Sequence, residues 1–246
     1  MEPKSIAWFL PAFNEAENLP IVIPDIYGYL SSLAKTFTIT IVNDGSKDNT
    51  SLVAEKLARE YPQVFVVHHK INQGYGAAVR SGLQASLATR HELIGYCDAD
   101  NQFRIQSLEP MLDKIEMAGA VIGYRLRRAD GLKRLVMGRG WTSLSRIALG
   151  YDARDIDCGF KLFRREVVAA VLPQITGRYA AISPELITRI QLAGFAVIEV
   201  GVEHYPRTLG SQTGDNLREI FGSFLDLYHL RREIKREMET NVANRS

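Results

Sequence analysis

Residues 93–102 read Leu-Ile-Gly-Tyr-Cys-Asp-Ala-Asp-Asn-Gln, an apolar run that ends in two carboxylates. A short apolar run bounded by polar residues is typical of a buried strand, predicted here over 93–97. Side chains two apart on an extended chain point the same way, so Asp98 and Asp100 can face one cation. Carboxylate oxygens suit Mg²⁺ or Mn²⁺, and Gln102 could supply a further oxygen. The same pair could instead be turn-forming or helix-capping aspartates.

Strands and helices alternate on both sides of this stretch, over the first 125 residues. Strands are predicted at 6–10, 37–42, 64–67, 93–97 and 120–124, with helices at 20–33, 52–58, 77–88 and 108–117. Strands separated by helices of this length imply right-handed crossovers and a mostly parallel sheet that is covered on both faces. The fold class is therefore α/β, and ligands of such folds collect at the carboxyl ends of the strands.

The pattern changes after Tyr124. Further strands are predicted at 159–163 and 196–202, and helices at 131–150, 166–172, 184–192 and 217–238. No repeat and no low-complexity tract interrupts the chain. We predict one domain over 1–215, followed over 216–246 by an amphipathic helix with a charged tail.

The composition is that of an ordinary globular protein. Of the 246 residues, 46% are hydrophobic and 24% charged, and the net charge is +2. No stretch approaches the roughly 18 apolar residues of a membrane span, and the amino-terminal residues have no signal-peptide pattern, so the expectation is a cytoplasmic protein. The two cysteines, Cys97 and Cys158, are too few for a disulfide framework or a four-cysteine zinc site.

Basic residues concentrate in one window of the chain. Residues 125–154 hold eight basic and two acidic residues, a net charge of +6, so the rest of the chain carries −4. This patch indicates an anionic partner, such as phosphates or a lipid surface, or else a solvated loop. Nucleic acid is disfavoured because no recognition module accompanies the patch.

Polar residues follow several of the other predicted strands. Asn14 and Glu15 follow the first strand, Asp44 follows the second, and Gly74 precedes the helix after the third. Glycine there lets backbone N–H groups approach a phosphate closely. Val79 stands where a dinucleotide fingerprint has Gly or Ala, which disfavours a nicotinamide or flavin site.

These stretches together carry a family resemblance. The motifs are Leu-Pro-Ala-Phe-Asn-Glu at 10–15, Val-Asn-Asp-Gly-Ser at 42–46, Asn-Gln-Gly-Tyr-Gly-Ala-Ala at 72–78 and Asp-Ala-Asp at 98–100. In this order they resemble the family-2 inverting glycosyltransferases, which have the GT-A fold, an αβα sandwich. Two later motifs, Asp-Cys-Gly-Phe-Lys at 157–161 and His-Tyr-Pro-Arg at 204–207, resemble the polyprenyl-phosphate branch that includes the dolichyl-phosphate mannose synthases.

The resemblance implies roles for individual residues. The nucleotide sugar would be held by Pro11, Phe13, Glu15, Val42, Asp44, Gly74, Asp98 and Ala99. The metal, Mg²⁺ or Mn²⁺, would bind Asp98, Asp100 and Gln102. The catalytic residues would be Asp100, Arg125 and Arg207, and the acceptor phosphate would contact Arg125, Arg139, Arg207 and Ser211.

Two positions depart from the pattern of the family. Gln212 stands where members often have a phosphate-binding lysine, and Asp-Cys-Gly replaces a common Ser-Gly. We therefore predict that Cys158 is a pocket residue and not a nucleophile, because no neighbouring base or cation in the sequence would activate it.

The chemistry favours a phosphate acceptor. A lipid phosphate is largely a dianion at neutral pH and needs no base, only cations that hold it beside the donor diphosphate. The predicted reaction moves mannose or glucose from a GDP- or UDP-sugar to a polyprenyl phosphate. One alternative is transfer to a hydroxyl of a soluble or polysaccharide acceptor, with Asp157 or Glu185 as base. Another is an inactive sugar-nucleotide-binding or scaffold protein.

A lipid acceptor implies contact with an anionic membrane surface. The segment 131–150 mixes Lys133, Arg134, Arg139 and Arg146 with apolar residues, a composition that suits the interface plane. The helix from Leu217 has five basic residues and five acidic ones, so we expect it to pack onto the domain or onto another subunit. The prediction is a peripheral protein at the cytoplasmic membrane face and a possible homo-oligomer.

Overall fold

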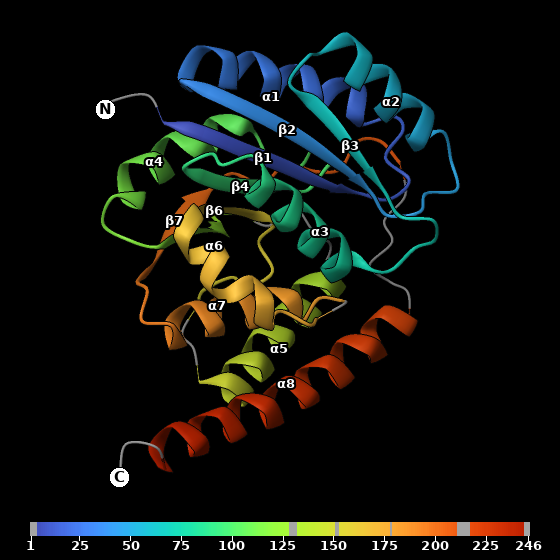
Figure 1. The fold of residues 1–246 in the computed structure, drawn as a ribbon. Coiled ribbons are helices and arrows are strands. Elements are labelled where there is room, and N and C mark those ends of the chain that lie inside the picture. The colour runs from blue at the N-terminus through green and yellow to red at the C-terminus, as the bar shows by residue number, and fades with distance from the viewer. Residues whose placement is uncertain (1–3, 128–131, 151–152, 178, 211–216, 244–246) are drawn as a thin grey trace.

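The computed structural model describes residues 4–127, 132–150, 153–177, 179–210 and 217–243, with the side chains of 132–139, 217–221 and 237–243 left aside (Figure 1). Its centre is one seven-stranded sheet in the order β3-β2-β1-β4-β6-β5-β7. The strands are β1 (Ser5–Ala12), β2 (Thr36–Asn43), β3 (Val64–His68), β4 (Leu93–Cys97), β5 (Ala120–Arg125), β6 (Phe160–Arg164) and β7 (Val197–Val202). Strand β6 is antiparallel to both of its neighbours, and the other strand pairs are parallel.

Helices cover both faces of this sheet. They are α1 (Leu19–Leu33), α2 (Thr50–Glu60), α3 (Tyr75–Ala88), α4 (Glu109–Ile115), α5 (Leu132–Leu149), α6 (Arg165–Val171), α7 (Ile182–Leu192) and α8 (Leu217–Ala243). Short 3₁₀ turns at Ile105–Leu108 and Leu172–Gln174 join two of them to their neighbours. Figure 1 shows α1 and α2 above the sheet, α3, α6 and α7 below it, and α5 and α8 farther out.

Successive side chains of β1 point to opposite faces of the sheet, so they belong to two different hydrophobic cores. Ile6, Trp8 and Leu10 belong to one core with residues of α1, α2 and α4, whereas Ala7 and Phe9 belong to a second core with residues of α3, α6 and α7. A strand buried on both faces reads as a continuous apolar run, as these residues do. The predicted αβα sandwich with a mostly parallel sheet is confirmed.

The predicted elements after Tyr124 also exist, but their arrangement could not be read from their order. Strand β6 comes after β5 in the chain yet inserts between β4 and β5. Its antiparallel direction brings its first residues to the edge where the parallel strands end. Helix α8 packs against α5, where the Trp141 and Phe224 rings meet in a T-shaped contact with centroids 5.5 Å apart. This agrees with the expectation that the helix packs onto the domain.

Candidate active site

The candidate site lies where the parallel strands end. Strand β1 leads to Glu15, β2 to Asp44, β4 to Asp98 and Asp100, and β7 to Arg207. Because these strands run the same way, their carboxyl ends meet at one edge of the sheet. The antiparallel β6 adds the residues just before its start to the same edge.

Asp98 lies against Tyr75 of α3 and Gly159, the residue just before β6. Its Oδ1 accepts a 2.9 Å hydrogen bond from the Tyr75 hydroxyl, and its backbone N–H donates to the Gly159 carbonyl at 3.1 Å. A Cβ on Gly159 would lie 2.0 Å from Asp98 Oδ2, closer than any side chain allows. Glycine at this position is what lets β6 pass beside the carboxylate.

The surroundings of Asp98 oppose a second negative charge. Burial, and then the nearby Asp100 carboxylate, raise the pKa of Asp98 to about 7. The Tyr75 hydrogen bond and the charges of Lys161 and Arg125 act in the opposite direction. A divalent cation between the two carboxylates would relieve this repulsion, so the residues fit a metal. Among the described residues, no three His, Cys, Asp or Glu side chains form a metal-binding group.

Lys161 is a fully buried ammonium group that interacts with Asp98. Its Nζ donates to the Cys158 carbonyl and to Ser183 Oγ at 3.4 Å, and it lies 5.5 Å from the centroid of the Tyr96 ring. A buried charge needs compensation by hydrogen bonds or by an opposite charge. Asp98 is the carboxylate whose pKa Lys161 lowers, so the two groups stabilise each other's charged forms.

Arg207 joins the ends of the first, fourth and seventh strands. Its Nη2 donates to both carboxylate oxygens of Glu15 at 2.8 Å, and its Nη1 lies 3.8 Å from Asp100 Oδ2. Burial raises the pKa of Glu15, whereas Asn18 and Arg207 lower it. The guanidinium therefore lies between the carboxylates of Glu15 and Asp100.

Gln102, the third predicted metal ligand, has a structural contact. Its side-chain amide donates to the Tyr205 carbonyl at 2.9 Å, and its backbone N–H donates to Asp100 Oδ1 at 3.2 Å. The first contact ties the segment that carries Arg207 to the loop after β4. The proposal that its amide oxygen binds a metal stays a prediction.

The predicted nucleoside residues cluster at the ends of β1 and β2. Pro11 pairs with Val42 in the sheet register, and both are buried, as is Ala99 in the loop after β4. Phe13 is partly exposed just beyond β1. Contact of these residues with a nucleotide stays a prediction.

Asp44 holds the loop that precedes α3. Its carboxylate accepts hydrogen bonds from the backbone N–H groups of Gln73 and Gly74, each at 2.9 Å, and pairs with His69 Nδ1 at 2.6 Å. Gly74 has φ +97°, which favours glycine. Asp44 thus shapes the loop that the sequence predicted for phosphate contact.

Arg125 is paired within the protein. Its Nε and Nη2 donate to the two carboxylate oxygens of Asp155 at 2.6 and 2.7 Å, in the two-pronged geometry typical of arginine. This pairing raises the pKa of Arg125 against the effect of its burial. The structure thereby fixes the guanidinium near the site, and its contact with a phosphate stays a prediction.

The remaining candidates have different outcomes. The Arg139 side chain and Ser211 lie outside the described residues. The Glu185 carboxylate is buried and accepts hydrogen bonds from the N–H groups of Thr176 and Gly177, so the protein already engages this candidate base. Asp157 is partly buried just before β6. Burial raises the pKa of Cys158 to about 12, which keeps it a thiol at neutral pH.

The sequence reasoning missed four residues of this site: Tyr75, Asp155, Gly159 and Lys161. Three of them lie inside the quoted motifs, at 72–78 and 157–161, but received no role there. Their contacts with Asp98 and Arg125 depend on the placement of β6 and α3, so no spacing in the sequence could have shown them.

Comparisons with known proteins show the family to which this chain belongs. Residues 7–172 match the model of the glycosyl transferase family 2. Polyprenol monophosphomannose synthase of Mycolicibacterium smegmatis is 31% identical over 85% of this chain and 82% of its own length. A dolichyl-phosphate beta-glucosyltransferase of Trichomonas vaginalis is 33% identical over 79% of this chain, which spans 64% of that protein.

A third relative and a solved structure complete the comparison. Undecaprenyl-phosphate mannosyltransferase of Micrococcus luteus is 27% identical over 82% of this chain and 84% of its own length. Glucosyl-3-phosphoglycerate synthase of Mycobacterium tuberculosis superposes with a TM-score of 0.68, at 18% identity, over 93% of this chain and 78% of that one, which shows the shared fold. The chain therefore belongs to glycosyl transferase family 2 and is a glycosyltransferase.

Proposed function

We propose that this protein moves a hexose, mannose or glucose, from a GDP- or UDP-sugar to a polyprenyl phosphate, with the help of Mg²⁺ or Mn²⁺. The observation that carries the proposal is the meeting of Asp98, Asp100 and Arg207 at one edge of the sheet. Paired carboxylates suit a cation that binds a diphosphate, and an arginine suits a phosphate. The names of the relatives, which act on polyprenol, dolichyl and undecaprenyl phosphates, support the acceptor class.

The metal part of the proposal has two supports. Asp98 and Asp100 repel each other in a buried setting, and solved structures of the same fold contain Mn²⁺ or Mg²⁺ with UDP. When bound, the cation would stabilise the charge that develops on the leaving diphosphate. Asp98 and Asp100 would hold it, with Gln102 as a further oxygen donor.

The proposal that the acceptor is a phosphate rests on the charges of the acceptor and of the site. In the reaction, an acceptor oxygen bonds to C1 of the sugar while the bond from C1 to the diphosphate breaks. A phosphate acceptor carries no proton that must be removed, whereas a hydroxyl does. Glu185, one candidate base, is engaged by backbone N–H groups, and Arg207 lies where it can offset the charge of a second anion. A lipid phosphate therefore fits this site better than an alcohol.

The test compares two acceptors that differ by one phosphate. The purified protein is incubated with radiolabelled GDP-mannose or UDP-glucose and either polyprenyl phosphate or the matching polyprenol, and label in the organic phase is counted. We expect transfer to the phosphate alone, with EDTA and Asp100→Asn each abolishing it and Asp113→Asn, on the exposed side of α4, leaving it unchanged. Transfer to the polyprenol or to an oligosaccharide instead would establish the hydroxyl-acceptor alternative, and full activity in EDTA would exclude the metal.

A further inference from the structure

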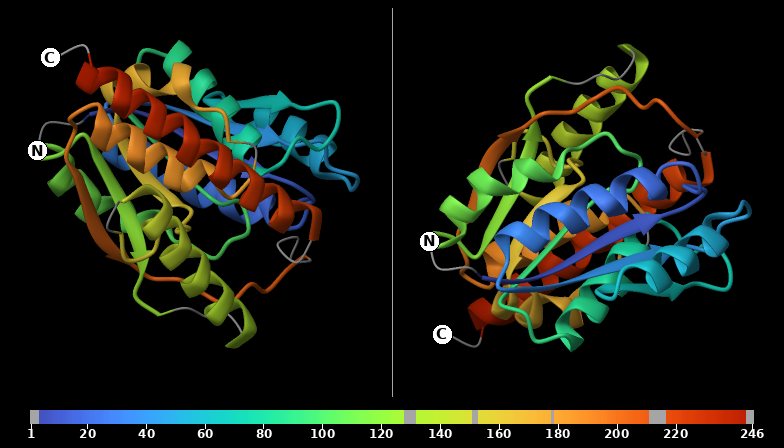
Figure 2. Two further views of the ribbon diagram at one scale, coloured as in Figure 1. Left: turned by 90° about the horizontal axis from the view of Figure 1, so that it is seen from below. Right: turned by 90° about the horizontal axis from the view of Figure 1, so that it is seen from above.

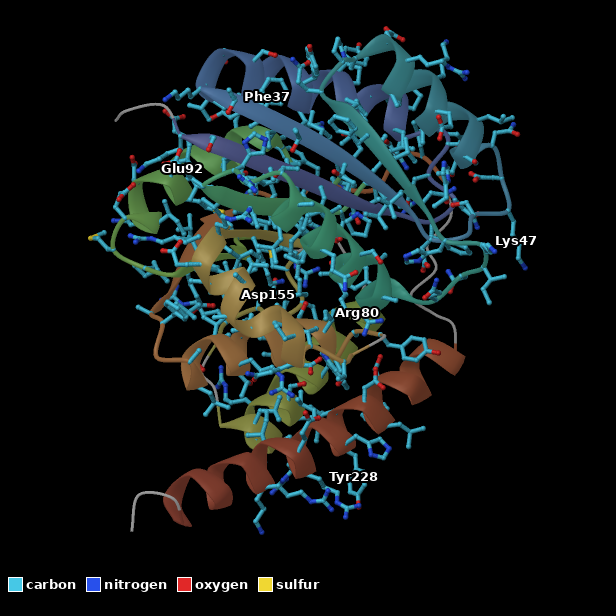
Figure 3. All side chains as sticks on the ribbon, in the orientation of Figure 1. Phe37, Lys47, Arg80, Glu92, Asp155 and Tyr228 are labelled. Atoms are coloured by element: carbon cyan, nitrogen blue, oxygen red, sulfur yellow. The ribbon has the colours of Figure 1, made fainter. Side chains whose placement is uncertain are left out.

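Helix α8 forms an outer surface of the molecule. Seen from below, it lies in front of the rest of the protein, with α7 behind it and α5 beside it (Figure 2, left). Its inward side is buried at Ser223, Leu227, Leu230 and Ile234. Its outward side exposes Phe224 at 47%, Leu225 at 44% and Tyr228 at 57%, and Figure 3 shows Tyr228 on the side away from the sheet. Three large apolar side chains are thus in contact with solvent within two turns of one helix.

Helix α5, which adjoins α8, also exposes apolar side chains. Trp141 of α5 touches Phe224 of α8 edge-on, and on the same helix Leu144 and Ile147 are exposed at 40% and 76%. Scattered exposed apolar residues are ordinary, but a group that spans two adjoining helices marks a contact surface.

The fold places the described acidic side chains of α8 on one side of the helix. Asp226 Oδ2 accepts a hydrogen bond from the Tyr179 N–H at 3.3 Å, and Glu233 pairs at 2.8 Å with Arg189, whose side chain is fully buried. At about 100° per residue, these two acids lie on one side of the helix, roughly 140–180° away from Tyr228 and Lys235. Among the described side chains of the helix, the acids therefore lie apart from Tyr228 and Lys235.

The basic residues of α8 share the outward side with the apolar ones. Arg231, Arg232, Lys235 and Arg236 are all exposed, and the Arg232 guanidinium lies 5.8 Å from the centroid of the Tyr228 ring. Both described acids of the helix, Asp226 and Glu233, face α7 and the segment before it. The outward side thus combines aromatic and aliphatic side chains with several positive charges, a composition suited to the headgroup region of an anionic bilayer.

We infer that this outward side of α8, with Leu144 and Ile147 of α5, is the surface that docks the protein on an anionic lipid bilayer. We name it the α8–α5 face: Leu144, Ile147, Phe224, Leu225, Tyr228, Arg231, Arg232 and Lys235. Charge complementarity selects the occupant. A second copy that used the same face would bring the arginines of both copies together, and like charges repel. Anionic headgroups oppose them with the right sign.

The position of α8 fits the proposed function. The purpose that we assign to the docking, access to a lipid phosphate, rests on that proposed function. The helix begins seven residues after Gly210, which adjoins Arg207, so at most about 25 Å of chain separates them. Figure 1 shows the amino end of α8 on the side where β1 and β2 end. A bilayer against the α8–α5 face would therefore lie beside the edge that holds the site, within reach of a lipid phosphate. The contribution of Lys133, Arg134 and Arg139, whose side chains lie outside the described residues, stays a separate prediction.

The test is flotation with vesicles of phosphatidylglycerol and phosphatidylcholine that contain no polyprenyl phosphate. We expect the protein to float at low salt and to be released at 1 M NaCl. Arg231→Glu/Arg232→Glu should weaken binding at least about 30-fold, because each basic residue near an anionic surface contributes about fivefold and the new acids repel the surface. Tyr228→Ser should also weaken vesicle binding, because it removes an apolar side chain from the docking surface. Lys56→Glu/Arg59→Glu, an equal charge change on exposed positions of α2, should leave binding unchanged.

Sugar transfer separates this inference from the proposed function. Arg231→Glu/Arg232→Glu should lose transfer to acceptor embedded in vesicles and keep transfer to a short-chain, water-soluble prenyl phosphate. Absence of flotation at low salt, equal flotation of the variant, or equal loss in the α2 control would overturn the inference. So would a dimer that the variant dissociates, in the absence of vesicle binding, since a second copy would then occupy the face. Flotation by a protein that is inactive on every prenyl phosphate would refute the proposed function and support the docking surface.

Discussion

Replacement of Asp98 by Asn should stabilise the metal-free protein at alkaline pH. A carboxyl group whose pKa rises from 3.8 to about 7 on folding binds its proton more tightly in the folded state. Between these two pH values the folded state therefore holds more protons than the unfolded state, and the free energy of unfolding falls as the pH rises. The penalty is complete above pH 7 and absent below about pH 4.

The magnitude follows from the pKa change. At 1.36 kcal/mol per pH unit, the penalty is about 4 kcal/mol at pH 8 and about 2 kcal/mol at pH 5.5. Asn has the shape of Asp, so it fits beside Gly159, and its amide oxygen can still accept the Tyr75 hydrogen bond. Asp98→Asn should therefore raise the free energy of unfolding by roughly these amounts, and by more at pH 8 than at pH 5.5.

Urea denaturation in EDTA at the two pH values measures this effect. The matched control is Asp113→Asn on the exposed side of α4, where we expect changes below about 0.5 kcal/mol. Addition of Mg²⁺ at pH 8 should stabilise the wild type and not Asp98→Asn, which should also be inactive. A variant that is less stable than the wild type at pH 8, or equally shifted at both pH values, would refute the electrostatic account of this carboxylate.

Two further changes test the contacts around the site. Arg207→Ala leaves the buried Glu15 carboxylate without the donor that holds it at 2.8 Å, so it should abolish sugar transfer and cost about 3 kcal/mol of stability, measured by urea denaturation. Adding Glu15→Gln to the same chain should restore the stability without the activity. Failure to restore the stability would contradict the pairing of the two residues. Gly159→Ala places a methyl group 2.0 Å from Asp98 Oδ2 and should remove metal binding, measured by calorimetry. The control Gly140→Ala meets no atom within 4 Å and should leave metal binding intact. Metal binding by Gly159→Ala would show that the site is less closely packed than described.

Local pattern was enough to predict the elements of the fold and several of the loops that meet at one edge of the sheet. Alternating apolar strands and amphipathic helices predicted the layered α/β fold because each element must bury one face or two, whatever its neighbours are. Asp98 and Asp100 could be placed at the edge of the sheet because they directly follow a buried strand. The loop residues after β1 and β2 reached the same edge for the same reason.

Only the tertiary structure decided what these residues touch. The insertion of β6 between β4 and β5 brings Gly159 and Lys161 beside Asp98, although some 60 residues separate them in the chain. The pairing of Arg207 with Glu15 likewise spans 192 residues. The sorting of charge around α8 depends on Arg189, which belongs to another helix. Such contacts leave no periodic pattern in a sequence, because they are fixed by how strands and helices pack and not by spacing along the chain.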